Sequence, residues 1–258
     1  MDRLKNKTAL IFGSDPITLG IAARFVEEGA TVSIIDEIPA LAACDGASGI
    51  RAVAMADGRI ESASRAVAEA MGGRPLDILV IGGGDIPPES AWRTIDELDI
   101  STTMDGERRE TALALAAAKA ARPGLSADGG SIVFLFSPAG LYSEGGWADR
   151  TVTHHAKRGL ARALAAEWGQ HQIRVNTLVP FAQTPGLEAY RQRNPQLVDW
   201  RISKVAMRRA GDPVRDIGGA AVFLASDDTR FLTGSMIFAD GGGFLTTPVV
   251  ETSVQAAL

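Results

Sequence analysis

The amino-acid sequence predicts a single α/β domain over residues 1–258, with a doubly wound parallel sheet of about seven strands and helices on both faces. Short apolar runs alternate along the whole chain with longer segments of helical periodicity. The runs show no polar–apolar alternation, which is typical of strands covered on both faces. Hydrophobic residues make up 46% of the chain, which suffices for a sizeable core.

The apolar runs predict the strands of the sheet. Each holds about five residues, and β-branched or aromatic side chains are frequent in most of them. The expected strands cover residues 8–12, 31–36, 51–55, 77–81, 131–136, 173–178 and 235–239.

Helical patterns fill the intervals between these runs. Gly29 is a natural stop for the first helix, and Pro213 suits the first turn of the last one because its missing N–H is harmless there. The expected helices cover residues 19–28, 60–71, 107–121, 151–169 and 213–225. Residues 181–210 read as one long irregular stretch that covers a substrate site, and residues 244–258 as an apolar C-terminal tail.

Charge and composition exclude several classes of function. The net charge of −5 argues against a nucleic-acid partner, and no apolar run is long enough for a membrane span. Cys44 is the single cysteine, so an internal disulfide framework and a cysteine-based metal site are excluded. The N-terminus lacks an apolar signal core, and we therefore expect a cytoplasmic protein.

Several segments, in this order, resemble the short-chain dehydrogenase/reductase (SDR) family. They include Leu-Ala-Ala-Glu-Trp-Gly at 164–169, Ile-Arg-Val-Asn at 173–176, Arg-Ala-Gly-Asp-Pro at 209–213 and Asp-Gly-Gly at 240–242. The resemblance extends over roughly residues 5–243. It implies a Rossmann-type fold, a nicotinamide cofactor, a small-molecule substrate and a homotetramer or homodimer, while the reaction depends on the site.

The expected phosphate-binding loop departs from the family pattern. That pattern is Thr-Gly, three residues, then Gly-Ile-Gly, with glycines for a tight turn and close approach of the pyrophosphate. Here Gly13 and Ser14 begin the loop, but Pro16 and Thr18 stand where the later glycines belong. The carboxylate of Asp15 would repel a pyrophosphate. Dinucleotide binding and a remodelled, empty loop both stay open.

Asp36 supports the binding of NAD. It ends the second strand at the spacing where an acid accepts hydrogen bonds from the adenosine ribose, and it would repel the extra phosphate of NADP. The resemblance assigns the remaining cofactor contacts to Asp57, Gly82, Gly83, Gly84 and Thr184.

The expected catalytic helix lacks the family's tyrosine and lysine. The family pattern is a Ser, a Tyr thirteen residues later and a Lys four after that; here Ser137 matches, but Arg150 and His154 occupy the other two positions. Arginine cannot exchange a proton, yet it can stabilise an oxyanion, and histidine titrates near neutral pH. A register shifted by three residues would make Thr153 and Lys157 the pair.

Three functions remain open from the sequence. The first is an NAD-preferring oxidoreductase for a small hydroxyl or carbonyl substrate, with Ser137, Arg150 and His154 as catalytic residues. The second is a lyase, hydrolase or dehalogenase-like enzyme that has lost the cofactor. The third is a catalytically inactive binding partner. No residue pattern names the substrate.

Overall fold

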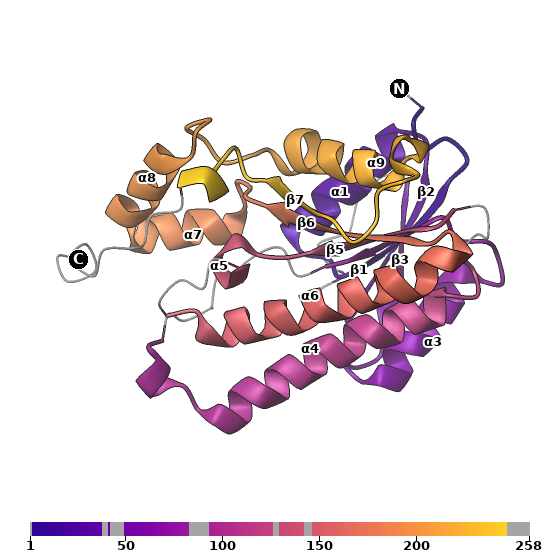
Figure 1. The fold of residues 1–258 in the computed structure, drawn as a ribbon, viewed down its shortest axis with the longest axis horizontal. Coiled ribbons are helices and arrows are strands. Elements are labelled where there is room, and N and C mark those ends of the chain that lie inside the picture. The colour runs from indigo at the N-terminus through magenta and orange to yellow at the C-terminus, as the bar shows by residue number, and fades with distance from the viewer. Residues whose placement is uncertain are drawn as a thin grey trace.

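The computed structural model describes residues 2–37, 41, 49–82, 93–125, 129–141 and 146–246. Within these ranges the chain forms a seven-stranded parallel sheet in the order β3-β2-β1-β4-β5-β6-β7 (Figure 1). The strands are β1 (Thr8–Phe12), β2 (Thr31–Glu37), β3 (Ile50–Met55), β4 (Ile78–Ile81), β5 (Ser131–Leu135), β6 (Arg174–Pro180) and β7 (Met236–Ala239). The predicted doubly wound parallel sheet is confirmed.

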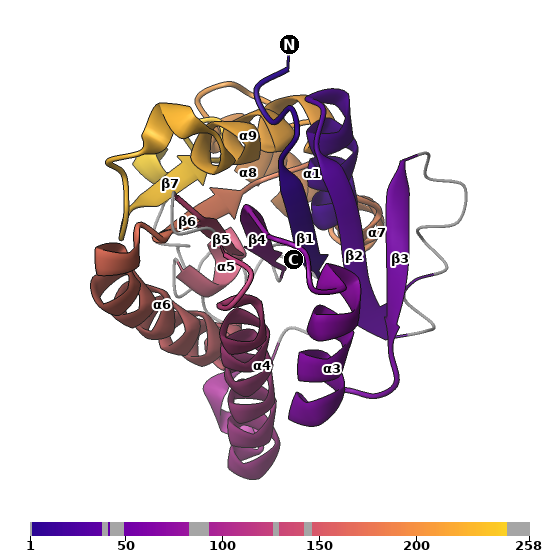
Figure 2. The same cartoon turned by 90° about the vertical axis from the view of Figure 1, so that its right-hand side faces the viewer.

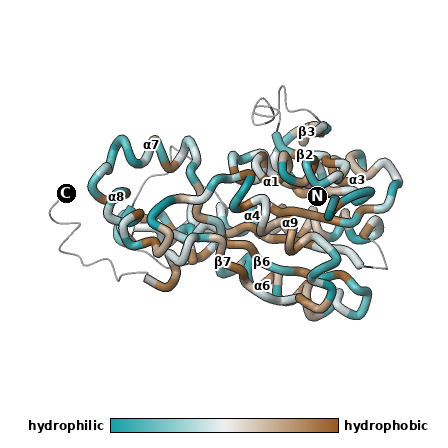
Figure 3. Tube along the Cα trace, turned by 90° about the horizontal axis from the view of Figure 1, so that it is seen from above, coloured by the Kyte–Doolittle hydropathy of each residue, from teal (hydrophilic) through white to brown (hydrophobic). Residues whose placement is uncertain are grey.

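Helices cover both faces of the sheet (Figure 2). On one face lie α1 (Pro16–Glu27) and α9 (Gly218–Ala225), and the opposite face carries α3 (Ile60–Met71), α4 (Ile100–Ala121) and α6 (Ala148–Trp168). Each face has its own hydrophobic core, because side chains of the strands point alternately to the two faces. Figure 3 shows the hydrophobic strand segments in the interior of the molecule.

Residues 181–210 differ from the sequence-based expectation. Instead of an irregular stretch they contain α7 (Pro185–Arg193) and α8 (Pro195–Lys204), which pack against each other. Each helix begins at a proline, and the Thr184 hydroxyl accepts a hydrogen bond from Leu187 N at 3.1 Å at the start of α7. The expectation of one long irregular stretch was wrong, because Thr184 and the two prolines supply helix starts within it.

The first turn of two helices also lies earlier than the apolar periodicity predicts. The side chain of Asp15 caps α1, and that of Asp99 caps α4 by accepting a hydrogen bond from Thr102 N at 2.8 Å. Both caps bring the helix N-termini to the carboxyl edge of the sheet. This edge is where open α/β sheets bind ligands.

Candidate functional site

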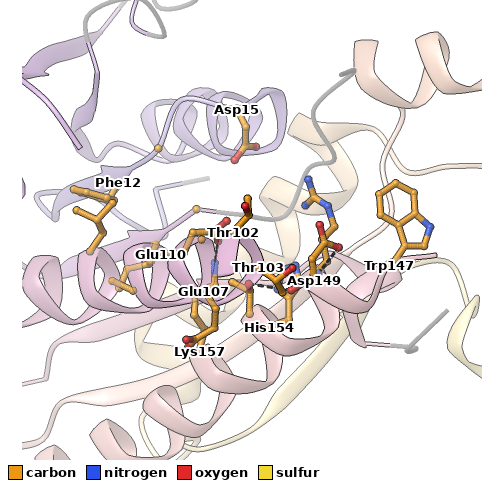
Figure 4. Close-up of a pocket in the computed structure, with 18 of the residues that line it drawn as sticks. Phe12, Asp15, Thr102, Thr103, Glu107, Glu110, Trp147, Asp149, His154 and Lys157 are labelled. Atoms are coloured by element: carbon orange, nitrogen blue, oxygen red, sulfur yellow. Dashed lines mark hydrogen bonds and ion pairs between the residues drawn. The ribbon is translucent and has the colours of Figure 1, made fainter. Parts of the chain in front are cut away.

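A cavity of about 630 Å³ opens at the carboxyl edge of the sheet, beside β1, β2 and β4 (Figure 4). Its walls come from the loop after β1, the ends of β2 and β4, and the facing sides of α4 and α6. Its lining side chains include Asp15, Asp36, Arg93, Thr102, Glu107, Glu110, Trp147, Asp149, Arg150, Thr153, His154 and Lys157. No residue of 181–210 is among them, so the predicted covering role of that segment stays a prediction.

One face of α6 supplies the cationic wall of the cavity. Arg150, His154 and Lys157 follow one another at spacings of four and three residues, which places all three on one side of a helix. Thr153 lies on the same face and donates its hydroxyl to the Asp149 carbonyl at 3.1 Å. The structure therefore brings both alternative registers, Arg150 with His154 and Thr153 with Lys157, to the same cavity.

Lys157 joins α6 to α4 through an ion pair. Its Nζ lies 3.0 Å from Glu110 Oε2, and the lysine side chain is only 4% exposed whereas that of Glu110 is 57% exposed. The buried ammonium is thus connected to solvent through a single carboxylate.

His154 is buried and neutral. Its ring meets the edge of Phe136 at a centroid distance of 5.4 Å, and its Nδ1 has no hydrogen-bond partner among the described residues. Burial, and to a smaller extent the nearby charges of Lys157, Arg150 and His155, together lower the pKa of His154 to about 2. The expected titration of this histidine near neutral pH is therefore wrong, because the ring is desolvated beside cations.

A close contact holds the His154 ring in place. Gly140 lies in α5 (Pro138–Leu141), and a Cβ added there would come within 2.1 Å of His154 Cδ2. Only the absence of a side chain at position 140 lets α5 approach the ring. The imidazole consequently has little freedom to turn and presents a fixed, uncharged polar group.

Arg150 and Trp147 lie at the outer end of the cavity. The guanidinium carbon of Arg150 is 5.8 Å from the centre of the Trp147 ring, within the range of a cation–π contact. Trp147 is buried, and its Nε1 has no hydrogen-bond partner among the described residues. These two side chains thus bring an indole ring and a guanidinium together at this end of the cavity.

Ser137 lies beside this wall rather than in it. The residue is fully buried, it is not a lining residue of the cavity, and its hydroxyl has no partner in the described part of the chain. It directly precedes α5, which packs against α6. The catalytic role expected for Ser137 stays a prediction.

The loop after β1 combines one favourable feature for a dinucleotide with one unfavourable feature. Gly13 has a φ of +109°, a backbone conformation that favours glycine, and a Cβ added there would lie 3.5 Å from Gly82 Cα. Asp36 lines the cavity, and its Oδ2 accepts hydrogen bonds from the Ser14 N–H and hydroxyl, so a ribose would share this carboxylate with Ser14. However, Asp15 Oδ1 accepts the N–H groups of Ile17 and Thr18 at 2.9 and 3.1 Å. The residues fit the ribose of a dinucleotide and do not fit its diphosphate.

The other residues assigned to the cofactor differ in where the structure places them. Asp57 accepts a hydrogen bond from the Ser62 hydroxyl at 2.5 Å, which lowers the pKa of its carboxyl group, and it does not line the cavity. Thr184 caps α7 as described above. Gly83 and Gly84 lie outside the described residues, whereas Gly82 lines the cavity.

Two residues that line the cavity were not predicted from the sequence. Glu110 sits in the middle of an expected helix and Arg93 outside any expected element, so neither carries a local signal.

Among the described residues there is no cluster of three ligating side chains that could hold a metal ion. In the same ranges no helix is both long and apolar enough to cross a membrane.

Comparisons with known proteins give a consistent result. A family model described as enoyl-(acyl carrier protein) reductase matches residues 14–243. The oxidoreductase UcpA of Escherichia coli is 34% identical over 96% of this chain and 98% of its own length. The 2,5-dichloro-2,5-cyclohexadiene-1,4-diol dehydrogenase LinX of Sphingobium indicum is 31% identical over 93% of this chain and 97% of its own length.

Solved structures share the whole fold. A short-chain dehydrogenase/reductase of Burkholderia xenovorans superimposes with a TM-score of 0.81 at 27% identity, covering 95% of this chain and 99% of that one. A double variant of the Serratia marcescens short-chain dehydrogenase/reductase gives a TM-score of 0.77 at 25% identity, covering 93% and 99%. The similarity therefore extends over the sheet and the helices on both its faces.

Proposed function

Because the chain belongs to the short-chain dehydrogenase/reductase family of oxidoreductases, we propose that it oxidises a small hydroxyl substrate or reduces the matching carbonyl, with NAD preferred over NADP. The observation that carries this proposal is the cationic face of α6, which lies in one cavity with Asp36. LinX, whose name gives a diol as its substrate, supports a hydroxyl-bearing molecule for this chain. The comparisons do not favour a cofactor-free enzyme or an inactive partner.

Asp36 supports the preference for NAD. Its carboxylate lies on the cavity wall near the end of β2 and would accept hydrogen bonds from the ribose hydroxyls. The same negative charge would repel a phosphate on that ribose. A bound nicotinamide would supply or accept the hydride. The chain's own residues would then manage the charge and the proton of the reacting oxygen.

Arg150 and His154 would hold that oxygen. The guanidinium of Arg150 keeps its charge and stabilises a developing oxyanion, but it cannot serve as the proton donor. His154, neutral and fixed by Gly140, can donate or accept one hydrogen bond without changing charge. Neither residue therefore supplies the proton that the reaction exchanges.

Lys157 is the residue best placed for the proton. In the direction of reduction, the substrate oxygen would take a proton from Nζ, and the lysine would regain one from solvent through Glu110. In the direction of oxidation the same path would run in reverse. This role revises the set of catalytic residues expected from the sequence, because His154 cannot titrate near neutral pH.

The test combines cofactor choice with two variants of α6. NADH and NADPH are compared by absorbance in the presence of cyclic and linear ketones, and we expect turnover with NADH to exceed that with NADPH. Lys157→Met should lower kcat by about 100-fold or more, the usual contribution of a general acid. Arg162→Ala, on an exposed position of the same helix outside the cavity, should leave turnover unchanged. Full turnover of Lys157→Met would remove the lysine from the mechanism.

A further inference from the structure

In the first turn of α1, which follows β1, the backbone N–H groups of Ile17, Thr18 and Leu19 already donate hydrogen bonds within the chain. A helix N-terminus binds a diphosphate through N–H groups that have no partner within the protein. Here Pro16 has no N–H at all, and the N–H groups that follow it in the first turn all donate to Asp15. The printed distances are 2.9 Å from Ile17 N to Asp15 Oδ1, 3.1 Å from Thr18 N to Asp15 Oδ1 and 2.9 Å from Leu19 N to the Asp15 carbonyl oxygen.

The backbone N–H groups of Gly13 and Ser14, which precede the helix, also donate hydrogen bonds within the chain. Ser14 donates both its N–H and its hydroxyl to Asp36 Oδ2, at 2.7 and 2.8 Å. Gly13 N donates to the Ile35 carbonyl at 2.8 Å. A second carboxylate thus holds the loop from the β2 side, independently of Asp15. Asp15 and Asp36 therefore satisfy N–H donors of this loop from within the chain.

Asp15 also occupies the space over the end of β4. A Cβ added to Gly82 would come within 3.4 Å of Asp15 Oδ2 and 3.2 Å of Thr18 Cγ2. In Figure 4 Asp15 projects from α1, apart from the His154 and Lys157 side chains across the cavity. The Lys157 ammonium, which is paired with Glu110, is therefore not placed to neutralise a diphosphate at this end.

We infer that Asp15 is a specificity-determining residue, whose carboxylate takes the place of the cofactor's diphosphate and weakens the binding of dinucleotides relative to ligands that carry only a ribose. The inference rests on the proposed function for the identity of the cofactor. A dinucleotide must displace the carboxylate from Ile17 and Thr18 before its own phosphates can accept those hydrogen bonds. Adenosine, which has the ribose but no phosphate, does not meet this competition.

The experiment uses two variants at position 15 and two matched controls. Asp15→Asn keeps a capping oxygen but removes the charge, whereas Asp15→Gly also frees the N–H groups, and glycine is itself a favourable N-cap residue. Asp212 provides the control, because it also precedes a proline and caps Val214 and Arg215 at 2.9 and 2.7 Å, and it does not line the cavity. Calorimetric titration of each full-length protein with NADH and with adenosine gives the dissociation constants.

Asp15→Gly should bind NADH about tenfold more tightly than the wild type or better, which corresponds to ~1.4 kcal/mol. Asp15→Asn should give a smaller gain, and adenosine should bind equally to all proteins. Asp212→Gly and Asp212→Asn should match the wild type with both ligands.

Each other outcome has a distinct meaning. Unchanged NADH affinity in both Asp15 variants, with NADH bound by the wild type, would overturn the inference and leave the proposed function standing. Equal tightening of adenosine and NADH would also overturn it, since the phosphates would then not matter. Tight binding by Asp15→Gly alone would support the inference and count against NAD as the cofactor of the native chain. No NADH binding by any protein would overturn both.

Discussion

Replacing His154 should change how the protein responds to acid. The unfolded chain would protonate this histidine near its ordinary pKa of 6.5, whereas burial keeps it neutral in the folded protein until about pH 2. Below pH 6.5 the unfolded state therefore binds one proton more than the folded state, and stability falls as the pH falls. Well above pH 6.5 neither state binds a proton at this site, so His154 no longer makes the stability depend on pH.

The size of the effect follows from the two pKa values. Each pH unit between them costs up to ~1.4 kcal/mol, so acidification from about pH 7.5 to about pH 5 should remove roughly 2 kcal/mol through this residue. For a chain of this length, that is a fall in Tm of about 4–8 °C. Carboxylates add their own acid dependence, so the difference between variant and wild type is the quantity to measure.

Thermal unfolding followed by circular dichroism at both pH values gives this difference. His154→Gln cannot be protonated and should lose several degrees less than the wild type on acidification. His155→Gln, on the exposed neighbouring position, should keep the wild-type dependence. Equal losses in His154→Gln and wild type would refute the assignment of a buried, neutral imidazole.

Three further predictions follow from close packing and exposed apolar surface. Gly140→Ala forces its methyl group against the His154 ring and should cost about 1–3 kcal/mol in chemical denaturation; a His154→Ala background should recover the part due to the ring, while the Arg150 carbonyl oxygen, 3.0 Å from the added Cβ, remains. Gly20→Ala places a Cβ 2.5 Å from Pro213 Cβ and should destabilise by a similar amount, while Gly159→Ala, with open space around it, should stabilise by up to ~1 kcal/mol. Exposed apolar side chains on α4 and α6 favour a dimer or tetramer, so a monomeric mass by light scattering would contradict that expectation.

The sequence predicted the sheet well because its strands are buried on both faces. Each predicted strand boundary lies within two residues of the structure, since an uninterrupted apolar run leaves little choice of limits. Helix starts were less accurate. They depend on capping side chains such as Asp15 and Asp99, which lie outside the apolar periodicity.

The site was predicted only in part, for a physical reason. Spacing along one helix shows that Arg150, His154 and Lys157 share a face, and this much is visible in the sequence. The pairing of Lys157 with Glu110 depends on how α4 packs against α6, and the low pKa of His154 depends on burial. Both are properties of the folded molecule that no local pattern contains. Asp15 was correctly noticed as a negative charge, but its capping role needs the helix start.

The strand order has a consequence for the way this protein folds. The chain builds β1, β2 and β3 outward in one direction, then returns to the centre for β4 and builds the other half. The two halves meet where Ala9 pairs with Ile78, and closing such a long loop costs entropy that later contacts must repay. One wall of the cavity belongs to the first half and the wall of α6 to the second. We therefore expect the cavity to be among the last features to form, after both halves have docked.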